Sequence, residues 1–123
     1  MNRHESREKI IFAIYQHLLL KKELEVTFAN NFYAEDVDDF INTIYEDLYA
    51  HMNDYIYEIG TLLVKWTFDR LNFVDQAILL EACSEIKLQL NDRPVIIDEA
   101  VIFSKTYSDE DSFKYINGVL HRL

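Results

Sequence analysis

Glycine and proline are scarce in this sequence, and that scarcity limits the folds available to it. The chain has 123 residues but only two glycines, Gly60 and Gly118, and one proline, Pro94. Sandwiches and barrels need many tight turns, which are usually built from these residue types. The sequence therefore predicts a mostly helical chain. The same scarcity excludes glycine-rich phosphate-binding loops, which need two or three glycines within a short span.

Apolar residues recur at three- and four-residue steps along most of the chain, and this spacing is typical of amphipathic helices. It predicts helices over residues 10–20, 37–52, 53–63, 74–90, 97–104 and 109–123, with a short helix or irregular connection over 21–35. Half of the residues are apolar and 14% are aromatic, which favours a packed globule over a disordered chain. We therefore predict an all-α bundle of six or seven helices, forming one domain over residues 1–123.

Polar residues in front of these segments predict where the helices begin. Asp36, Asn72 and Ser108 are residue types whose side chains cap helix N-termini, and Thr67 is placed to cap a single turn. The helix after Asn72 is the longest apolar pattern in the C-terminal half, so we expect it to be the central helix. Its acidic residues are predicted to form a solvated stripe on the other face: Asp75, Glu81 and Glu85.

Charge and cysteine content limit the environment and the partners. The formal net charge of −10 opposes non-specific binding to nucleic acid, so any RNA contact needs a local basic patch. The one cysteine, Cys83, lies in an apolar helical pattern and is predicted to be a buried structural thiol. No disulfide within the chain and no signal-peptide or membrane-spanning segment are expected, which favours a reducing cytoplasm.

The sequence predicts no catalytic centre, metal site or cofactor. The four histidines are widely separated and lack a metal-ligand spacing, and no serine stands in a nucleophile motif. The cluster of acidic residues at positions 35–39 resembles a calcium loop but lacks the glycine that such a loop requires. Each carboxylate cluster is explained by helix capping or solvation. We therefore expect a binding protein and not an enzyme.

Gly118 lies in the middle of the last helical pattern, where glycine costs about 0.5–1 kcal/mol relative to alanine. Its presence predicts that another backbone or a ligand comes too close for a β-carbon. Lys114 and Tyr115 are adjacent to it in the sequence. Cations beside aromatic rings are the combination used to bind single-stranded RNA. The basic N-terminus would join this surface if the fold brings the chain ends together; otherwise it is a solvated first turn.

Two stretches of the C-terminal half resemble motifs of the NusB family of bacterial transcription antitermination factors. WTFDRLNFVDQAILLEACSEI, from Trp66, is similar to the family's tryptophan-led corner and central helix. VIIDEAVIFSKTYSDEDSFKYINGVL, from Val95, is similar to its acidic-Glu-Ala helix start, its Asp-Ser pair and its terminal aromatic-x-Asn-Gly-Val-Leu. These motifs cover about residues 66–120. The N-terminal half matches weakly, through Arg7, Ala13 and Tyr15.

The resemblance implies two small helical subdomains and a role in binding without catalysis. Members of the family bind the single-stranded boxA segment of nascent RNA together with NusE, a small-subunit ribosomal protein. The complex helps RNA polymerase pass terminators, notably in ribosomal RNA transcription. These partners, with no membrane, are the expectation for this chain, and a homodimer is left open.

The resemblance also assigns residues by position. Those expected to bind RNA are cations and tyrosines near the two chain ends: Arg3, Arg7, Lys9, Tyr15, Lys105, Lys114 and Tyr115. Those expected to bind the protein partner are acidic: Asp75, Glu81, Glu85 and Asp111.

The N-terminus departs from the family pattern, which often has a dense run of arginines. Here the cations are fewer and are mixed with Glu5 and Glu8, so weaker binding to RNA alone is expected. An acidic chain would instead gain association rate with a basic ribosomal protein. Two alternatives follow: a scaffold of the same fold that has lost RNA binding and docks a protein or itself, or an accessory domain that serves an RNA methyltransferase in trans.

Overall fold

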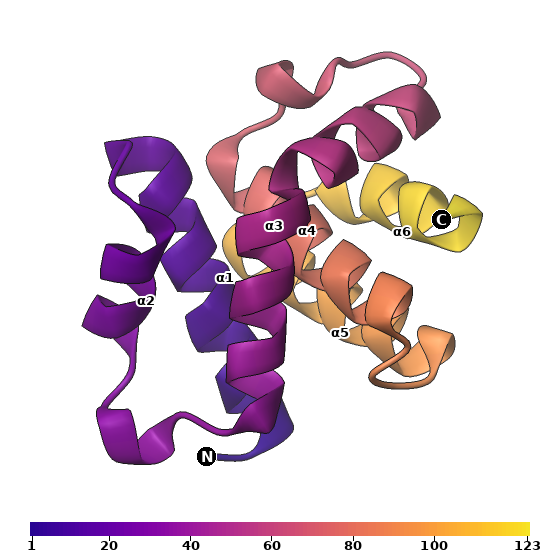
Figure 1. Cartoon of the computed structure of the whole chain (residues 1–123). Helices are drawn as coiled ribbons and strands as arrows, with labels where there is room; N and C mark the ends of the chain where they lie inside the picture. The colour runs from indigo at the N-terminus through magenta and orange to yellow at the C-terminus, as the bar shows by residue number, and fades with distance from the viewer.

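A computed structural model describes all 123 residues and contains six α-helices and no strand. Two single turns of 3₁₀-helix, η1 (Ala34–Asp36) and η2 (Phe68–Arg70), stand in the connections. The all-α prediction is confirmed, with the helices arranged as in Figure 1: α1 (Arg3–Leu20), α2 (Leu24–Asn31), α3 (Asp39–Leu62), α4 (Phe73–Leu88), α5 (Arg93–Tyr107) and α6 (Ser112–Arg122).

Helix α4 is the centre of the molecule, as predicted. Twelve of its sixteen residues are buried, because α1, α3, α5 and α6 all pack against it. Helices α1 and α2 lie on one side of the molecule and α5 and α6 on the other, with α3 between them (Figure 1). A helix that is covered on all sides cannot keep a solvated face, and this has direct consequences for its acidic residues.

Helix α3 is one continuous helix of 24 residues, so the prediction of two helices that meet near Asn53 is wrong. Its apolar residues keep their three- and four-residue steps through that position, and Asn53 is exposed. The predicted cap at Asp36 is also wrong. Asp36 lies in η1, and it is the side chain of Asp38 that accepts a hydrogen bond from the backbone N–H of Ile41.

The start of α4 follows the prediction, and the start of α6 does not. Asn72 caps α4 by accepting a hydrogen bond from the backbone N–H of Asp75 at 2.8 Å. Ser108 instead lies at the C-terminal end of α5, where its hydroxyl donates to Asp75. Helix α6 begins four residues later, at Ser112, because the predicted first turn of acidic residues forms the loop between α5 and α6.

The core is one cluster of 29 buried apolar residues to which all six helices contribute. The thiol of Cys83 is part of it, and burial raises the pKa of Cys83 to about 12. The prediction of a buried structural thiol is confirmed. None of the helices combines the length and apolar character needed to cross a bilayer.

Candidate nucleic-acid interface

The N-terminal turns of α1 lie against α5, so the fold places the N-terminus beside the C-terminal half of the chain. The imidazole of His4 stacks on Phe103 with ring centroids 4.8 Å apart, and its Nδ1 lies 3.0 Å from a carboxylate oxygen of Glu99. One turn further along α1, Glu8 accepts a hydrogen bond from the hydroxyl of Tyr107. Side chains from residues about 95 positions apart therefore share one surface.

Arg7 holds this arrangement together from inside the protein and is not available to RNA. Its side chain is 3% exposed. The Nε donates to Glu85 at 2.7 Å, the Nη2 donates to the other oxygen of Glu85 at 3.0 Å, and the Nη1 donates to Glu99 at 3.0 Å. The prediction that Arg7 contacts RNA is wrong, because its guanidinium is buried and is already paired with two carboxylates.

The other predicted cations are accessible to different degrees. Arg3 is 45% exposed but lies over the ring of Phe40 and 3.7 Å from Asp38. Lys114 is exposed and forms an ion pair with Asp111 at 3.2 Å. Lys105 lies over the ring of Phe113 and, like the half-buried Lys9, has no carboxylate within ion-pair distance. Four of the predicted cations are thus at least partly accessible to a ligand.

Tyr115 lies on α6 with its hydroxyl directed inward. The hydroxyl donates to the carboxylate of Asp75, which also accepts from Ser108 at 2.6 Å. Burial, followed by this hydrogen bond, raises the pKa of Tyr115. Asp75 therefore ties the start of α6 and the end of α5 to α4. The ring of Tyr115 remains half-buried, as does that of Tyr15 on α1.

A hollow of about 170 Å³ beside Tyr115 contains residues that the sequence did not single out. Tyr115, Val119 and Arg122 line it from α6, and Lys65 and Trp66 line it from the connection after α3. Trp66 is 54% exposed. Two aromatic rings and two cations thus surround one hollow. The single tryptophan was visible in the sequence, but only the fold shows that it is exposed and that the connection after α3 reaches α6.

Gly118 lies on the same side of α6 and leaves space that a side chain would occupy. A β-carbon built on it would have only one neighbour within 4 Å, the Nη2 of Arg122 at 3.7 Å. No backbone of this chain approaches it, so that half of the sequence prediction is wrong. A ligand that approaches Gly118 remains a prediction.

The predicted acidic stripe of α4 is buried. Asp75, Glu81 and Glu85 are 1%, 3% and 0% exposed, so the expected solvated face is wrong and direct contact of these residues with a partner would require opening the core. Each carboxylate lies under a neighbouring helix: Asp75 under α6, and the other two near Arg7 of α1. Asp111, at the start of α6, is exposed and accessible to a partner.

The pKa values of the two buried glutamates near Arg7 are shifted in opposite directions. Burial, together with the negative charge of Glu85, raises the pKa of Glu81 well above its usual value, and the Oε2 of Glu81 has no hydrogen-bond partner. Burial alone would also raise the pKa of Glu85, but hydrogen bonds with Glu81 and Arg7 outweigh it and lower that pKa. Of the two, Glu85 is the carboxylate whose charge Arg7 neutralises, and Glu81 is the one whose protonated form is favoured.

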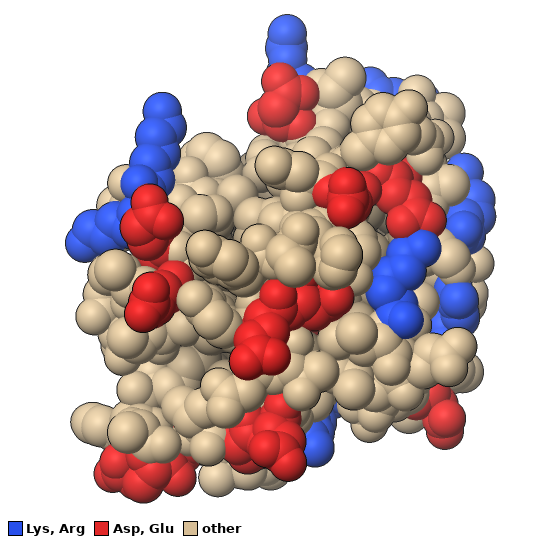
Figure 2. All heavy atoms as spheres, viewed as in Figure 1, with Lys and Arg blue, Asp and Glu red and all other residues tan.

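Acidic and basic side chains are distributed unevenly over the surface. Figure 2 shows that the face formed by α2 and the neighbouring part of α3 consists of neutral and acidic side chains, with Lys and Arg mainly toward its edges. The cations beside Tyr115 belong to α5, α6 and the connection after α3. No group of three His, Cys, Asp or Glu side chains is arranged to hold a metal ion.

Comparison of the sequence with known proteins finds one family and relatives that share one name. The sequence profile of the NusB family matches residues 4–123. The transcription antitermination protein NusB of Oceanobacillus iheyensis is 36% identical over 125 residues, covering 100% of this chain and 98% of that protein. The protein of the same name from Listeria innocua is 37% identical, covering 98% and 94%.

Solved structures have the same fold. Thermotoga maritima NusB superposes with a TM-score of 0.90 at 26% identity, covering 99% of this chain and 89% of that one. A crystal structure of the antitermination factors NusB and NusE in complex with dsRNA superposes with a TM-score of 0.83 at 20% identity, covering 98% and 93%.

Proposed function

This chain belongs to the NusB family of transcription antitermination factors, and from this premise we propose that it binds boxA-type RNA together with the ribosomal protein NusE. The observation that carries the proposal is the family match over residues 4–123. The complex would act with RNA polymerase as it passes terminators, notably in ribosomal RNA transcription. We further propose that the protein acts by binding without catalysis, and that it does so in the cytoplasm, where transcription takes place.

We place the RNA on the surface that joins the start of α1, the end of α5 and the start of α6. The exposed or half-buried groups that would meet phosphates and bases are Arg3, Lys9, Tyr15, Lys105, Lys114 and Tyr115. The hollow beside Tyr115 extends this set with Lys65, Trp66 and Arg122. Bases stack on aromatic rings while cations follow the backbone. A strand that enters this hollow would pass Gly118, where the missing β-carbon allows a close approach.

Two buried residues act on this surface by positioning it. Arg7 fixes α1 against α4 and α5 through Glu85 and Glu99, so it holds Arg3 and Lys9 in place without touching RNA. Asp75 fixes Tyr115 on α6. The structure of NusB and NusE with dsRNA supports RNA and a ribosomal protein as joint ligands, and Asp111 is the acidic residue that we assign to the protein partner.

A scaffold that binds only proteins is the second candidate. The observation that favours it is the pairing of two predicted RNA-binding cations with carboxylates, Arg3 with Asp38 and Lys114 with Asp111. An RNA phosphate must compete with these carboxylates, which lowers affinity for RNA alone. The two candidates differ in one measurable property, the affinity for boxA RNA when NusE is present.

Fluorescence anisotropy of a labelled boxA-like RNA separates the candidates. The protein is titrated at two salt concentrations, with and without NusE. We expect binding that salt weakens and NusE strengthens, and we expect Lys114→Ala to weaken it about tenfold, since a phosphate contact is lost. Lys22→Ala, an exposed lysine in the turn between α1 and α2, is the matched control and should bind normally.

Absence of boxA binding by the folded protein in the presence of NusE would favour the scaffold. An effect of Lys22→Ala as large as that of Lys114→Ala would show that only overall charge matters, and would contradict the assigned surface. Replacing boxA by an RNA of scrambled sequence tests whether the bases are recognised.

A further inference from the structure

Two hollows follow one another between α2 and α3, on a part of the surface that the proposed RNA site does not use. The larger has a volume of about 480 Å³ and an apolar floor that includes Phe28, Phe32, Ile41 and Tyr45. The rings of Phe28 and Tyr45 meet edge to face, with centroids 5.1 Å apart. Phe28, Phe32 and Ile41 on this floor are buried and Tyr45 is half-buried, so the hollow is a shallow gap between the two helices above the core.

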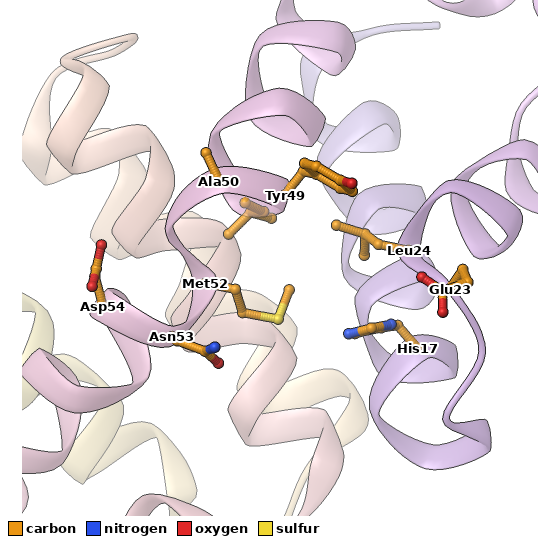
Figure 3. Close-up of a pocket in the computed structure, with 9 residues that line it drawn as sticks. His17, Glu23, Leu24, Tyr49, Ala50, Met52, Asn53 and Asp54 are labelled. Atoms are coloured by element: carbon orange, nitrogen blue, oxygen red, sulfur yellow. The ribbon is translucent and has the colours of Figure 1, made fainter.

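The second hollow, of about 260 Å³, lies further along α3 (Figure 3). His17 of α1 points across it toward Met52, and Leu24 at the start of α2 faces Tyr49 (Figure 3). Tyr49 is 72% exposed and its ring centroid lies 6.1 Å from that of Tyr45, which links the two hollows. We name the pair the α2–α3 groove.

The rim of the α2–α3 groove is acidic. Glu25 lines the larger hollow, and Glu23 and Asp54 line the smaller one. Burial, and then the negative charge of Glu25, raises the pKa of Tyr45. The nearby cations, Lys21 and Lys22, belong to the turn that precedes α2.

We propose that the α2–α3 groove docks a basic amphipathic helix of a further protein partner, distinct from the RNA and from the ribosomal protein. An apolar groove selects a helix by side chains at positions i, i+3 or i+4 and i+7. The acidic rim selects lysine or arginine on the flanks of that helix. Exposed tyrosines such as Tyr49 are residues that often supply binding energy at protein interfaces.

The dimensions of the groove fit a helix of moderate length. Its floor on α3 extends from Ile41 to Asp54, which corresponds to about 20 Å at the helical rise of 1.5 Å per residue. A partner helix of about 14 residues covers that length. The negative rim repels phosphate, so RNA does not fit this surface.

The groove and the α6 part of the proposed RNA surface can be occupied at the same time. Helix α2 packs on α1 and α3, whereas α6 packs on α3, α4 and α5, and α2 and α6 lie on opposite sides of α3 (Figure 1). A protein held in the groove would therefore be attached to the same antitermination factor without displacing its RNA.

The test uses a synthetic amphipathic peptide of about 14 residues, with Leu and Phe on one helical face and Lys on the other. A second peptide carries Glu in place of each Lys. Titration into ¹⁵N-labelled protein is expected to shift amide resonances of α2 and of α3 between Ile41 and Asp54, with the basic peptide only. Equal binding of the acidic peptide, or shifts spread over the molecule, would overturn the proposal, as would no binding of the basic peptide.

Charge-reversal variants distinguish an effect of the groove on peptide affinity from an effect of the overall negative charge. Glu25→Lys should weaken the basic peptide about tenfold, whereas Glu110→Lys, an exposed residue in the loop between α5 and α6, changes the net charge equally and should leave affinity within about twofold. Ala29→Trp, at an exposed position on α2 that lines the larger hollow, should fill it and abolish binding. Equal effects of the two charge reversals would overturn the proposal.

Two further outcomes would assign the groove to a different occupant. Sedimentation that shows a dimer of this chain, converted to monomer by Ala29→Trp, would make the occupant a second copy. Amide shifts in the groove caused by boxA RNA would make it a nucleic-acid surface. Either result overturns the proposal, and boxA affinity unchanged by Ala29→Trp supports the separation of the two surfaces.

Discussion

Arg7 is the one cation buried in the fold, and its guanidinium lies between the carboxylates of Glu85 and Glu99. Removing one member of a buried ion pair leaves the other charge without compensation and destabilises proteins by about 3–5 kcal/mol. We expect Arg7→Ala to lose about that much in free energy of unfolding, measured with urea. Its boxA affinity should fall as well, since α1 loses its anchor to α4 and α5.

Arg3 supplies the matched control four residues earlier. Its ion pair with Asp38 is exposed, and exposed pairs contribute less than about 1 kcal/mol. We expect Arg3→Ala to unfold at nearly the same urea concentration as the parent while its RNA binding weakens. A loss of less than about 1 kcal/mol for Arg7→Ala would contradict the buried network.

Glu81 adds a dependence of stability on pH. Because its pKa is raised, the folded protein holds this proton more tightly than the unfolded chain does. The stabilisation from that proton is complete below the ordinary pKa of glutamate and is lost as the pH rises through the raised pKa. Glu81→Gln has no such proton, so its stability relative to the parent should increase with pH, by up to about 1.4 kcal/mol per pH unit.

Urea unfolding of both proteins from about pH 5.5 to about pH 9 measures this difference. A difference that stays constant over this range would show that Glu81 is ionised in the folded protein. The sequence could not distinguish Glu81 from a surface glutamate. Its position on α4 was correct, but its burial depends on α1, which is more than sixty positions away in the chain.

Among the helices, α6 carries a glycine that the fold itself does not require. A β-carbon fits at Gly118, as it does at Gly60 of α3, where nothing lies within 4 Å. We expect Gly118→Ala and Gly60→Ala each to raise the free energy of unfolding by about 0.5–1 kcal/mol. Only Gly118→Ala should weaken boxA binding, by about tenfold, because only that β-carbon would meet the RNA.

Both variants are compared by urea unfolding and by RNA anisotropy. Unchanged RNA affinity for Gly118→Ala would show that no ligand approaches this part of α6. Destabilisation by Gly118→Ala would show a contact that the free protein's packing does not contain.

Helix boundaries show where local sequence was sufficient and where it was not. Asn72 caps α4 as expected, because an N-cap bond involves only residues three positions apart. Asp36 and Asp38 are equally good caps on local grounds, and the packing of Phe40 and Ile41 into the core selects Asp38. Ser108 has the right chemistry for a cap but forms a hydrogen bond with Asp75, a partner 33 positions away that no local pattern reveals.

For the molecule as a whole, the net charge of −10 limits how RNA is bound. For a single strand, each phosphate contact contributes about −0.7 to the slope of log affinity against log salt concentration. The four to six accessible cations of the proposed surface therefore predict a slope of log affinity against log salt of about −3 to −4. Anisotropy at several salt concentrations measures it. A slope near zero would exclude the phosphate contacts, and a much steeper one would require cations that this surface lacks.

The fold class and the central place of α4 were predictable from the sequence because they depend on the spacing of apolar residues. The candidate site was predictable only in part. The sequence identified the cations and Tyr115, but not that Arg7 is buried or that Trp66 lies near Tyr115. Those facts depend on which helices pack together, and charged residues at helical spacing look the same on a solvated face and under a neighbouring helix.

The burial of Cys83 makes the protein a convenient subject for site-specific labelling. Thiolates are the reactive form of cysteine, and this one thiol is both enclosed and, with its raised pKa, protonated at neutral pH. A maleimide dye would therefore attach to a cysteine introduced on the surface and leave the native one untouched. In the parent protein, the rate at which Cys83 is modified would report how often the central helix becomes exposed. The same reagent therefore labels a surface cysteine and measures the rate at which the core opens.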